Sequence, residues 1–212
     1  MLIALRVKQA VHCLIVIVMC LPAAVYAKTI MILGDSISAG YGLQPQQGWV
    51  TQLQQRLNQQ YPKKHQVVNA SVSGETSSGA LARLPRLLQT YKPHIVVIEL
   101  GGNDGLRGQP PQILQQNLGK LVNLSQQSKA TVILLGMKIP PNYGKAYTQA
   151  FEKTYLSVSQ QYKVKYLPFF MKGIAGHPQL MQKDLIHPNA QAQSILLNNA
   201  YPYIQQALHA KP

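Results

Sequence analysis

The stretch "HIVVIELGGND", residues 94–104, decides the fold because an apolar run ends there abruptly in glycines and polar side chains. Its apolar part lacks the polar alternation of a half-exposed strand, so it predicts a β-strand buried on both faces. Four similar runs alternate with segments whose apolar residues have helical spacing, which indicates an α/β fold with a parallel sheet. We predict strands over 29–34, 65–71, 94–101, 130–136 and 164–169, and helices over 48–61, 78–91, 110–128, about 146–162 and about 189–208.

Polar segments follow these strands, and in a parallel sheet ligands bind beyond the carboxyl ends of the strands. The chain has three aspartates, Asp35, Asp104 and Asp184, and each lies in one of these segments. Asp is a common turn residue, so this placement gives modest support for a site. The segments are Gly34-Asp35-Ser36, Asn69 to Gly74, Gly101 to Asp104, and Asp184 to Pro188.

The residue types in these segments fit acyl transfer by serine. Ser36 is the candidate nucleophile, His187 the candidate base, and Asp184 can hold the second ring nitrogen of that histidine. A developing oxyanion needs hydrogen-bond donors. The backbone N–H groups of Ser36 and Gly74 and the side-chain amide of Asn103 are available for that role.

Each motif alone has a simpler interpretation. "GDS" often caps a helix, and "GGND" is most often a turn. His177 lies in the same long loop as His187, but Ile174 occupies the position where an acidic partner would stand. We expect Asp35 to shape the turn that exposes Ser36.

The charge balance favours anionic partners. Residues 28–212 carry 18 Lys and Arg, after Arg6 and Lys8 are set aside, against 6 Asp and Glu, a net charge of about +12. Phospholipid head groups and phosphorylated substrates fit such a chain, and a generally cationic, soluble surface is the simpler alternative. The basic residues are scattered without interleaved aromatics, which argues against nucleic-acid binding.

The first 27 residues have the layout of a secretory signal peptide: Arg6 and Lys8, an apolar run, then small residues before Ala27. We therefore expect an exported protein, periplasmic or secreted, with one domain over 28–212. An uncleaved anchor is the alternative. Lipidation at Cys20 is disfavoured by Met19 before it. Since Cys13 and Cys20 both lie in this segment, the mature chain contains no thiol and no disulfide.

Taken in order, "GDSISAGYGL", "NASVSGETSSG", "LGGNDGLRG" and "DLIHPN" resemble the successive blocks of the SGNH (GDSL) hydrolase family. The likeness is greatest to its bacterial periplasmic thioesterase, lysophospholipase and arylesterase branch. It implies a three-layer α/β/α, flavodoxin-like sandwich with a five-stranded parallel sheet, and no metal or organic cofactor. It also implies that the triad is Ser36, Asp184 and His187, and that Ser36, Gly74 and Asn103 form the oxyanion hole.

In the same family the segment after the asparagine block forms part of a mobile wall for the acyl chain. The resemblance carries this substrate-binding role to Gly105, Leu106, Arg107, Gly108 and Gln109. Gln109 and Lys183 depart from the family pattern, which leaves the chain-length preference open.

We therefore expect a monomeric serine esterase that cleaves acyl esters and thioesters, including lysophospholipids, and contacts anionic lipid surfaces peripherally. Two alternatives remain open. One is a carbohydrate O-acetylesterase of the same fold. The other is a lipid- or anion-binding module without catalysis.

Overall fold

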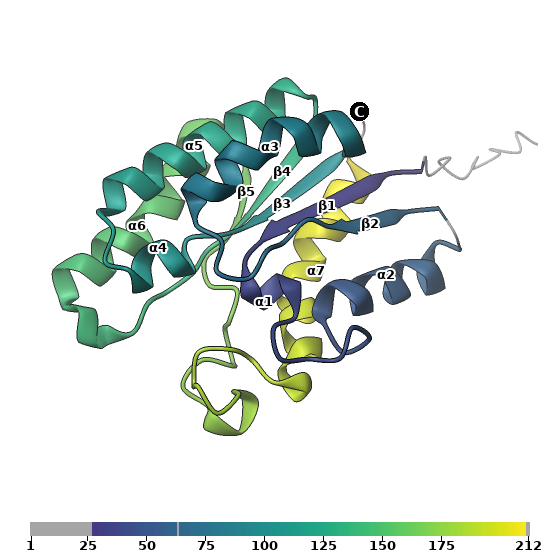
Figure 1. Ribbon diagram of the computed structural model, residues 1–212. Helices are drawn as coiled ribbons and strands as arrows, with labels where there is room; N and C mark the ends of the chain where they lie inside the picture. The colour runs from purple at the N-terminus through teal and green to yellow at the C-terminus, as the bar shows by residue number, and fades with distance from the viewer. Residues whose placement is uncertain (1–26, 63, 211–212) are drawn as a thin grey trace, which may run out of the picture.

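The computed structural model describes residues 27–62 and 64–210. Within them, five parallel strands form one sheet in the order β2-β1-β3-β4-β5 (Figure 1). The predicted signal peptide lies outside the described residues, apart from Ala27. The strands are β1 (Thr29–Gly34), β2 (Gln66–Asn69), β3 (Ile95–Glu99), β4 (Thr131–Leu135) and β5 (Lys165–Leu167).

Helices cover both faces of the sheet, with α3, α5 and α6 on one side and α2 and α7 on the other (Figure 1). Together with the strand order, these layers confirm the predicted three-layer, flavodoxin-like architecture. Its topological switch point lies between β1 and β3, where a ligand site is expected. The helices are α1 (Ser36–Ala39), α2 (Trp49–Gln60), α3 (Ser77–Tyr91), α4 (Gly102–Leu106), α5 (Pro111–Gln127), α6 (Lys145–Tyr162) and α7 (Gln193–His209), with 3-10 turns at Pro141–Tyr143, Pro178–Leu180 and Ala190–Ala192.

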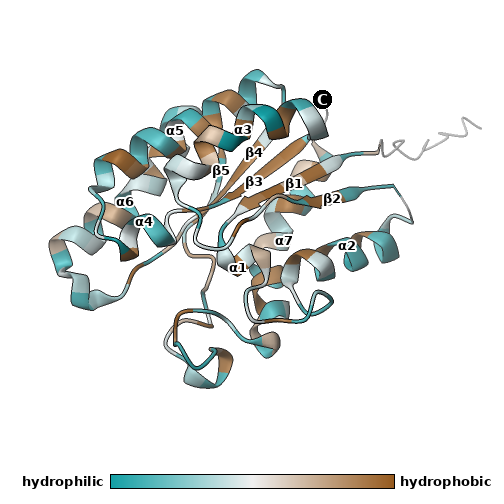
Figure 2. Cartoon of the chain, viewed as in Figure 1, coloured by the Kyte–Doolittle hydropathy of each residue, from teal (hydrophilic) through white to brown (hydrophobic). Residues whose placement is uncertain are grey.

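The core lies between the sheet and its two helical layers. Every residue of β3 is buried, as its apolar run predicts for Ile95 to Ile98, and Figure 2 shows the central strands as the most hydrophobic segments. Strands β2, β3, β4 and β5 are each two or three residues shorter than predicted, because the ends of the predicted runs lie in the turns that flank the strands. The short helices α1 and α4 were not predicted, since four or five residues are too few to show a helical period. Among the described residues, no helix is long and apolar enough to cross a bilayer.

One carboxyl group is buried in this core at the carboxyl end of β3. Glu99 is fully buried, and its Oε2 accepts a 2.6 Å hydrogen bond from the Ser38 hydroxyl, which accepts one from the Trp49 indole. Gly34 lies beside Glu99 in the sheet, and a Cβ at Gly34 would come within 2.8 Å of the carboxylate. Burial raises the pKa of Glu99 well above its usual range, and the nearby Asp35 charge raises it further.

We expect Glu99→Gln to gain thermal stability relative to the parent protein as pH rises. The unfolded chain loses the Glu99 proton near its usual pKa of 4.5, whereas the folded chain retains it to higher pH. The free energy of unfolding of the parent therefore falls from about pH 4.5 upward. Glutamine does not titrate, so the variant lacks this loss. Melting temperatures from pH 4.5 to 8 should show the Glu99→Gln difference becoming more positive by a few degrees.

Glu152→Gln is the matched control for loss of one carboxyl group, because Glu152 lies at the surface in an ion pair with Lys138. A Glu99→Gln difference that stays constant or becomes more negative with rising pH would contradict a buried, protonated Glu99.

Candidate active site

Ser36 lies in the turn that leads from β1 into α1, at the carboxyl end of the sheet. Asp35 caps α1, and its Oδ1 accepts a 3.0 Å hydrogen bond from the Ile37 N–H. Ser36 is the first residue of the helix. Because Asp35 supplies the cap, the Ser36 hydroxyl is left for another partner.

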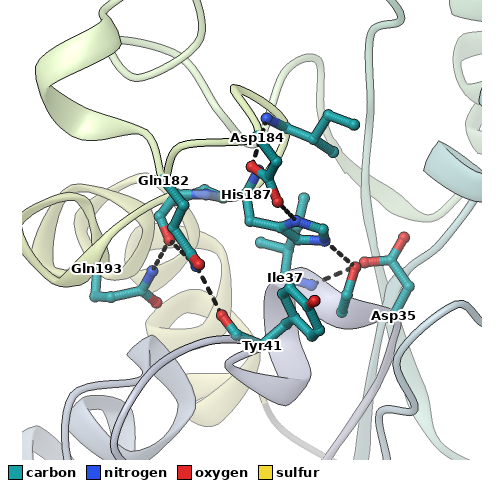
Figure 3. A network of polar contacts seen from close by, with 10 residues as sticks. Asp35, Ile37, Tyr41, Gln182, Asp184, His187 and Gln193 are labelled. Atoms are coloured by element: carbon teal, nitrogen blue, oxygen red, sulfur yellow. Dashed lines mark hydrogen bonds and ion pairs between the residues drawn. The ribbon is translucent and has the colours of Figure 1, made fainter.

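That partner is His187, whose Nε2 lies 2.9 Å from the Ser36 Oγ. The His187 Nδ1 lies 2.6 Å from Asp184 Oδ2, so the three side chains form one hydrogen-bonded line (Figure 3). With its proton on Nδ1, the imidazole donates to Asp184 and accepts from Ser36. The sequence places Ser36 and His187 at opposite ends of the domain, and the fold joins them.

The second oxygen of Asp184 fixes the backbone of the same turn. Asp184 Oδ1 accepts hydrogen bonds from the N–H groups of Ile186, at 2.9 Å, and His187, at 3.0 Å. Partial desolvation favours a higher pKa for Asp184, but the hydrogen bonds from His187 and Ile186 and the His187 charge outweigh it and lower the pKa to about 2. Asp184 is therefore ionised at neutral pH and can stabilise a protonated imidazole.

Two residues that sequence reasoning missed support this loop. The ring of Tyr41 packs against the His187 ring with centroids 4.6 Å apart. Gln182 donates from its side-chain amide to the backbone carbonyls of Tyr41, at 2.7 Å, and Pro188, at 3.1 Å. These contacts link the loop after β5 to the loop after α1 (Figure 3).

Asn103 lies in α4, beyond the carboxyl end of β3, and its amide points toward Asp35. The Nδ2 atom donates to the Glu75 carbonyl, at 3.0 Å, and to Asp35 Oδ2, at 3.2 Å. Gly74, next to Glu75, has a φ of 77° that favours glycine. Burial raises the pKa of Asp35 to about 6, although the Ile37 N–H, the His187 charge and the Asn103 amide oppose the rise.

An apolar cavity of about 580 Å³ opens beside these groups, with Ser36, Asn103 and His187 in its wall. Residues from the segments that follow β4 and β5 complete its walls together with neighbours of Ser36 and Asn103. Most of these residues were not predicted, although they too lie beyond the ends of strands. Hydrophobic side chains dominate these walls: Ile37, Leu106, Met137, Ile139, Phe169, Met171, Met181, Leu185 and Ile186.

The segment predicted as an acyl-binding wall only partly faces this cavity. Of its five residues, Leu106 lines the cavity, whereas Gly105 is buried against Ile139 and Phe151. Arg107 and Gly108 are exposed at the end of α4. The segment is tied down by two tyrosines: Tyr143 donates to the Leu106 carbonyl and Tyr147 to the Gln109 carbonyl.

Two further residues from the strand-end segments and the long loop lie apart from the Ser36–His187 contact. Asp104 is buried and accepts hydrogen bonds from the backbone N–H and hydroxyl of Ser77, so it anchors the start of α3. His177 is exposed in the loop. Among the described residues, no cluster of three or more His, Cys, Asp and Glu side chains forms a candidate metal site.

Comparison with known proteins places this geometry in a family. The sequence model of the GDSL-like Lipase/Acylhydrolase family matches residues 32–195 of this chain. Esterase TesA of Pseudomonas aeruginosa is 48% identical over 196 residues, which cover 92% of this chain and 96% of that protein. Thioesterase 1/protease 1/lysophospholipase L1 of Escherichia coli K12 is 43% identical over 173 residues, 82% of this chain and 81% of that protein.

A solved structure agrees with these sequence matches. The psychrotrophic esterase EstA from Pseudoalteromonas sp., in a structure inhibited by monoethylphosphonate, superposes with a TM-score of 0.82 at 45% identity. That match covers 86% of this chain and all of EstA. The chain belongs to the GDSL-like lipase/acylhydrolase (SGNH) family.

Proposed function

We propose that this chain is an exported serine esterase that hydrolyses acyl esters and thioesters through an acyl-enzyme intermediate. The observation that carries the proposal is the hydrogen-bonded line from Ser36 through His187 to Asp184, which lies beside an apolar cavity. The names of the relatives, an esterase and a thioesterase/lysophospholipase, support the same reaction class.

In the first half of the reaction, His187 Nε2 takes the Ser36 proton as Oγ attacks the acyl carbon. Asp184 holds the imidazole tautomer and stabilises the imidazolium that forms. The negative carbonyl oxygen accepts hydrogen bonds from the N–H groups of Ser36 and Gly74 and from the Asn103 amide. In the structure the Asn103 amide donates to the Glu75 carbonyl and to Asp35, so one of these contacts must give way to the oxyanion.

In the second half, the tetrahedral intermediate collapses and the acyl–oxygen or acyl–sulfur bond breaks. His187 gives its proton to the leaving alkoxide or thiolate, and the acyl group stays on Ser36. His187 then activates a water molecule that attacks the acyl carbon. This water gives a proton to His187 Nε2, and when the second tetrahedral intermediate collapses the bond between the acyl carbon and Ser36 Oγ breaks. His187 returns the proton to Oγ, which releases the carboxylic acid and restores the Ser36 hydroxyl.

We expect Ser36→Ala and His187→Ala each to lower kcat for a chromogenic acyl ester by ~10⁴-fold or more, because each removes a member of one catalytic unit. His177→Ala is the matched control, since His177 is an exposed histidine of the same loop, and it should retain full activity. Circular dichroism should show that all three variants are folded. Full activity in either triad variant would refute the proposal.

The cavity favours substrates with an acyl chain over acetylated sugars. Its walls are predominantly hydrophobic, so each added methylene of the acyl group gains burial, up to the length of the cavity. An acetyl group leaves most of that surface unused. We therefore propose medium-chain acyl groups, lysophospholipids among them, and rank carbohydrate deacetylation second.

A panel of acyl esters should give a higher kcat/KM for octanoyl than for acetyl groups on the same leaving group. Ala175, in the cavity wall, can be enlarged to tryptophan to shorten the space available. Ala175→Trp should lower kcat/KM for the octanoyl ester at least tenfold more than for the acetyl ester. Activity on acetylated sugars with none on octanoyl esters would reverse the ranking.

The proposal that the protein is exported rests on the sequence of residues 1–27. If they are a signal peptide, the protein recovered from outside the cytoplasm should begin at Lys28, within a few residues, when its N-terminus is sequenced. Recovery of the full-length chain from the membrane fraction would instead favour the uncleaved anchor.

A further inference from the structure

Three exposed hydrophobic side chains lie at or next to the cavity wall: Tyr41, Leu185 and Ile186, together called the mouth patch. Their exposed fractions are 52%, 65% and 47%. Leu185 and Ile186 line the cavity itself, and the Tyr41 ring packs on His187. Single exposed apolar residues are ordinary, but two that line one cavity and a third that packs on His187 in its wall form a patch that indicates an interaction site.

The backbone holds Leu185 and Ile186 in their exposed positions. The Asp184 carboxylate accepts hydrogen bonds from the N–H groups of Ile186 and His187. The same turn therefore carries two residues of the patch and orients the candidate base. Leu185 has a φ of 55°, a left-handed conformation that is unfavourable for a branched side chain. Such strain is common at functional sites, where the surrounding contacts maintain it.

The charges exposed on the described surface are predominantly positive. All six Asp and Glu side chains of the sequence lie in the described residues, and each is either buried or paired there. Their positions and partners are Asp35 and Glu99 (buried at the end of the sheet), Asp104 (Ser77), Glu75 (Arg83), Glu152 (Lys138) and Asp184 (His187).

Two exposed cations lie within two residues of the cavity lining in the sequence. Lys183 is exposed and immediately precedes Asp184. Arg107 is exposed after Leu106, a cavity residue, and donates to the Gly74 carbonyl. Apolar side chains flanked by Lys and Arg are the combination that binds an anionic lipid interface, where the apolar groups enter the acyl region and the cations face phosphate.

We propose that the mouth patch docks on an anionic lipid surface, so that acyl ester substrates pass from the lipid phase directly into the cavity. The passage of substrate from the lipid into the cavity rests on the proposed function. Binding to the lipid surface itself requires no catalysis. Tyr41, Leu185 and Ile186 enter the interface, while Lys183 and Arg107 remain at the level of the head groups. The surrounding net positive charge attracts the protein to the surface.

The experiment measures sedimentation of the Ser36→Ala protein with vesicles, so that hydrolysis cannot alter the lipids. Vesicles of phosphatidylcholine alone are compared with an equal mixture of phosphatidylcholine and phosphatidylglycerol, at low and high salt. We expect tighter binding to the mixed vesicles, weakened by salt. Adding Leu185→Ser or Ile186→Ser should weaken that binding by about tenfold, because each removes a side chain that enters the interface.

Leu156→Ser is the matched control, because Leu156 is a 44% exposed leucine on α6 and should leave vesicle binding unchanged. Failure of the Ser36→Ala protein to bind mixed vesicles, or equal losses in the Leu185 and Leu156 variants, would overturn the docking. Hydrolysis of a water-soluble acyl ester, measured separately with active protein, tests the proposed function. Binding without hydrolysis overturns only the function, and hydrolysis without binding overturns only the docking.

Discussion

The hydrogen bond between the Ser36 hydroxyl and the His187 ring joins residues that are 151 positions apart in the chain. The rest of the site depends on this contact. It forms because Ser36 follows β1 at the carboxyl edge of the sheet, and the loop after β5 crosses the same edge and carries His187 there. Since β1 and β5 lie on different sides of the central strand β3, the loop must cross the switch point, which is where the apolar cavity opens.

Two carboxyl groups are buried beneath this contact, and neither belongs to the predicted triad. Asp35 caps the helix that begins with Ser36 and accepts a hydrogen bond from Asn103, while Glu99 accepts one from Ser38, two residues after Ser36. Burial raises the pKa of both groups. Their burial lowers the stability of the fold, because a carboxyl group loses hydration when it is buried. Such a cost is common where polar groups shape a site inside a core. In return, the Ser36 turn has fixed polar contacts on its inner side.

Much of the fold was predictable because parallel strands and amphipathic helices leave a periodic pattern. The strand-end motifs likewise indicated Ser36, Asn103 and His187, since chemistry at a parallel sheet concentrates at one edge. The sequence was less informative where contacts depend on the path of a loop. In the sequence Glu99 stands at the end of an apolar strand, where a carboxylate could equally face solvent. Its burial follows from Gly34 and Ser38, which the fold places beside it.

The same limit explains the other differences. Tyr41 and Gln182 come from two loops whose contact no periodic pattern encodes. Asp104 follows a strand as the site residues do, yet it bonds Ser77 because α3 begins next to α4. Leu106 alone of the predicted acyl wall lines the cavity, because the short helix α4 turns its neighbours toward Phe151 or toward solvent.

A covalent label on the nucleophile distinguishes Ser36 from every other candidate. The protein is treated with a fluorophosphonate, digested, and mapped by mass spectrometry while ester hydrolysis is followed in parallel. We expect one adduct, on Ser36, that accumulates in step with the loss of activity and is absent from Ser36→Ala. Loss of activity with the adduct on another residue, or equal labelling of Ser36→Ala, would contradict Ser36 as the nucleophile.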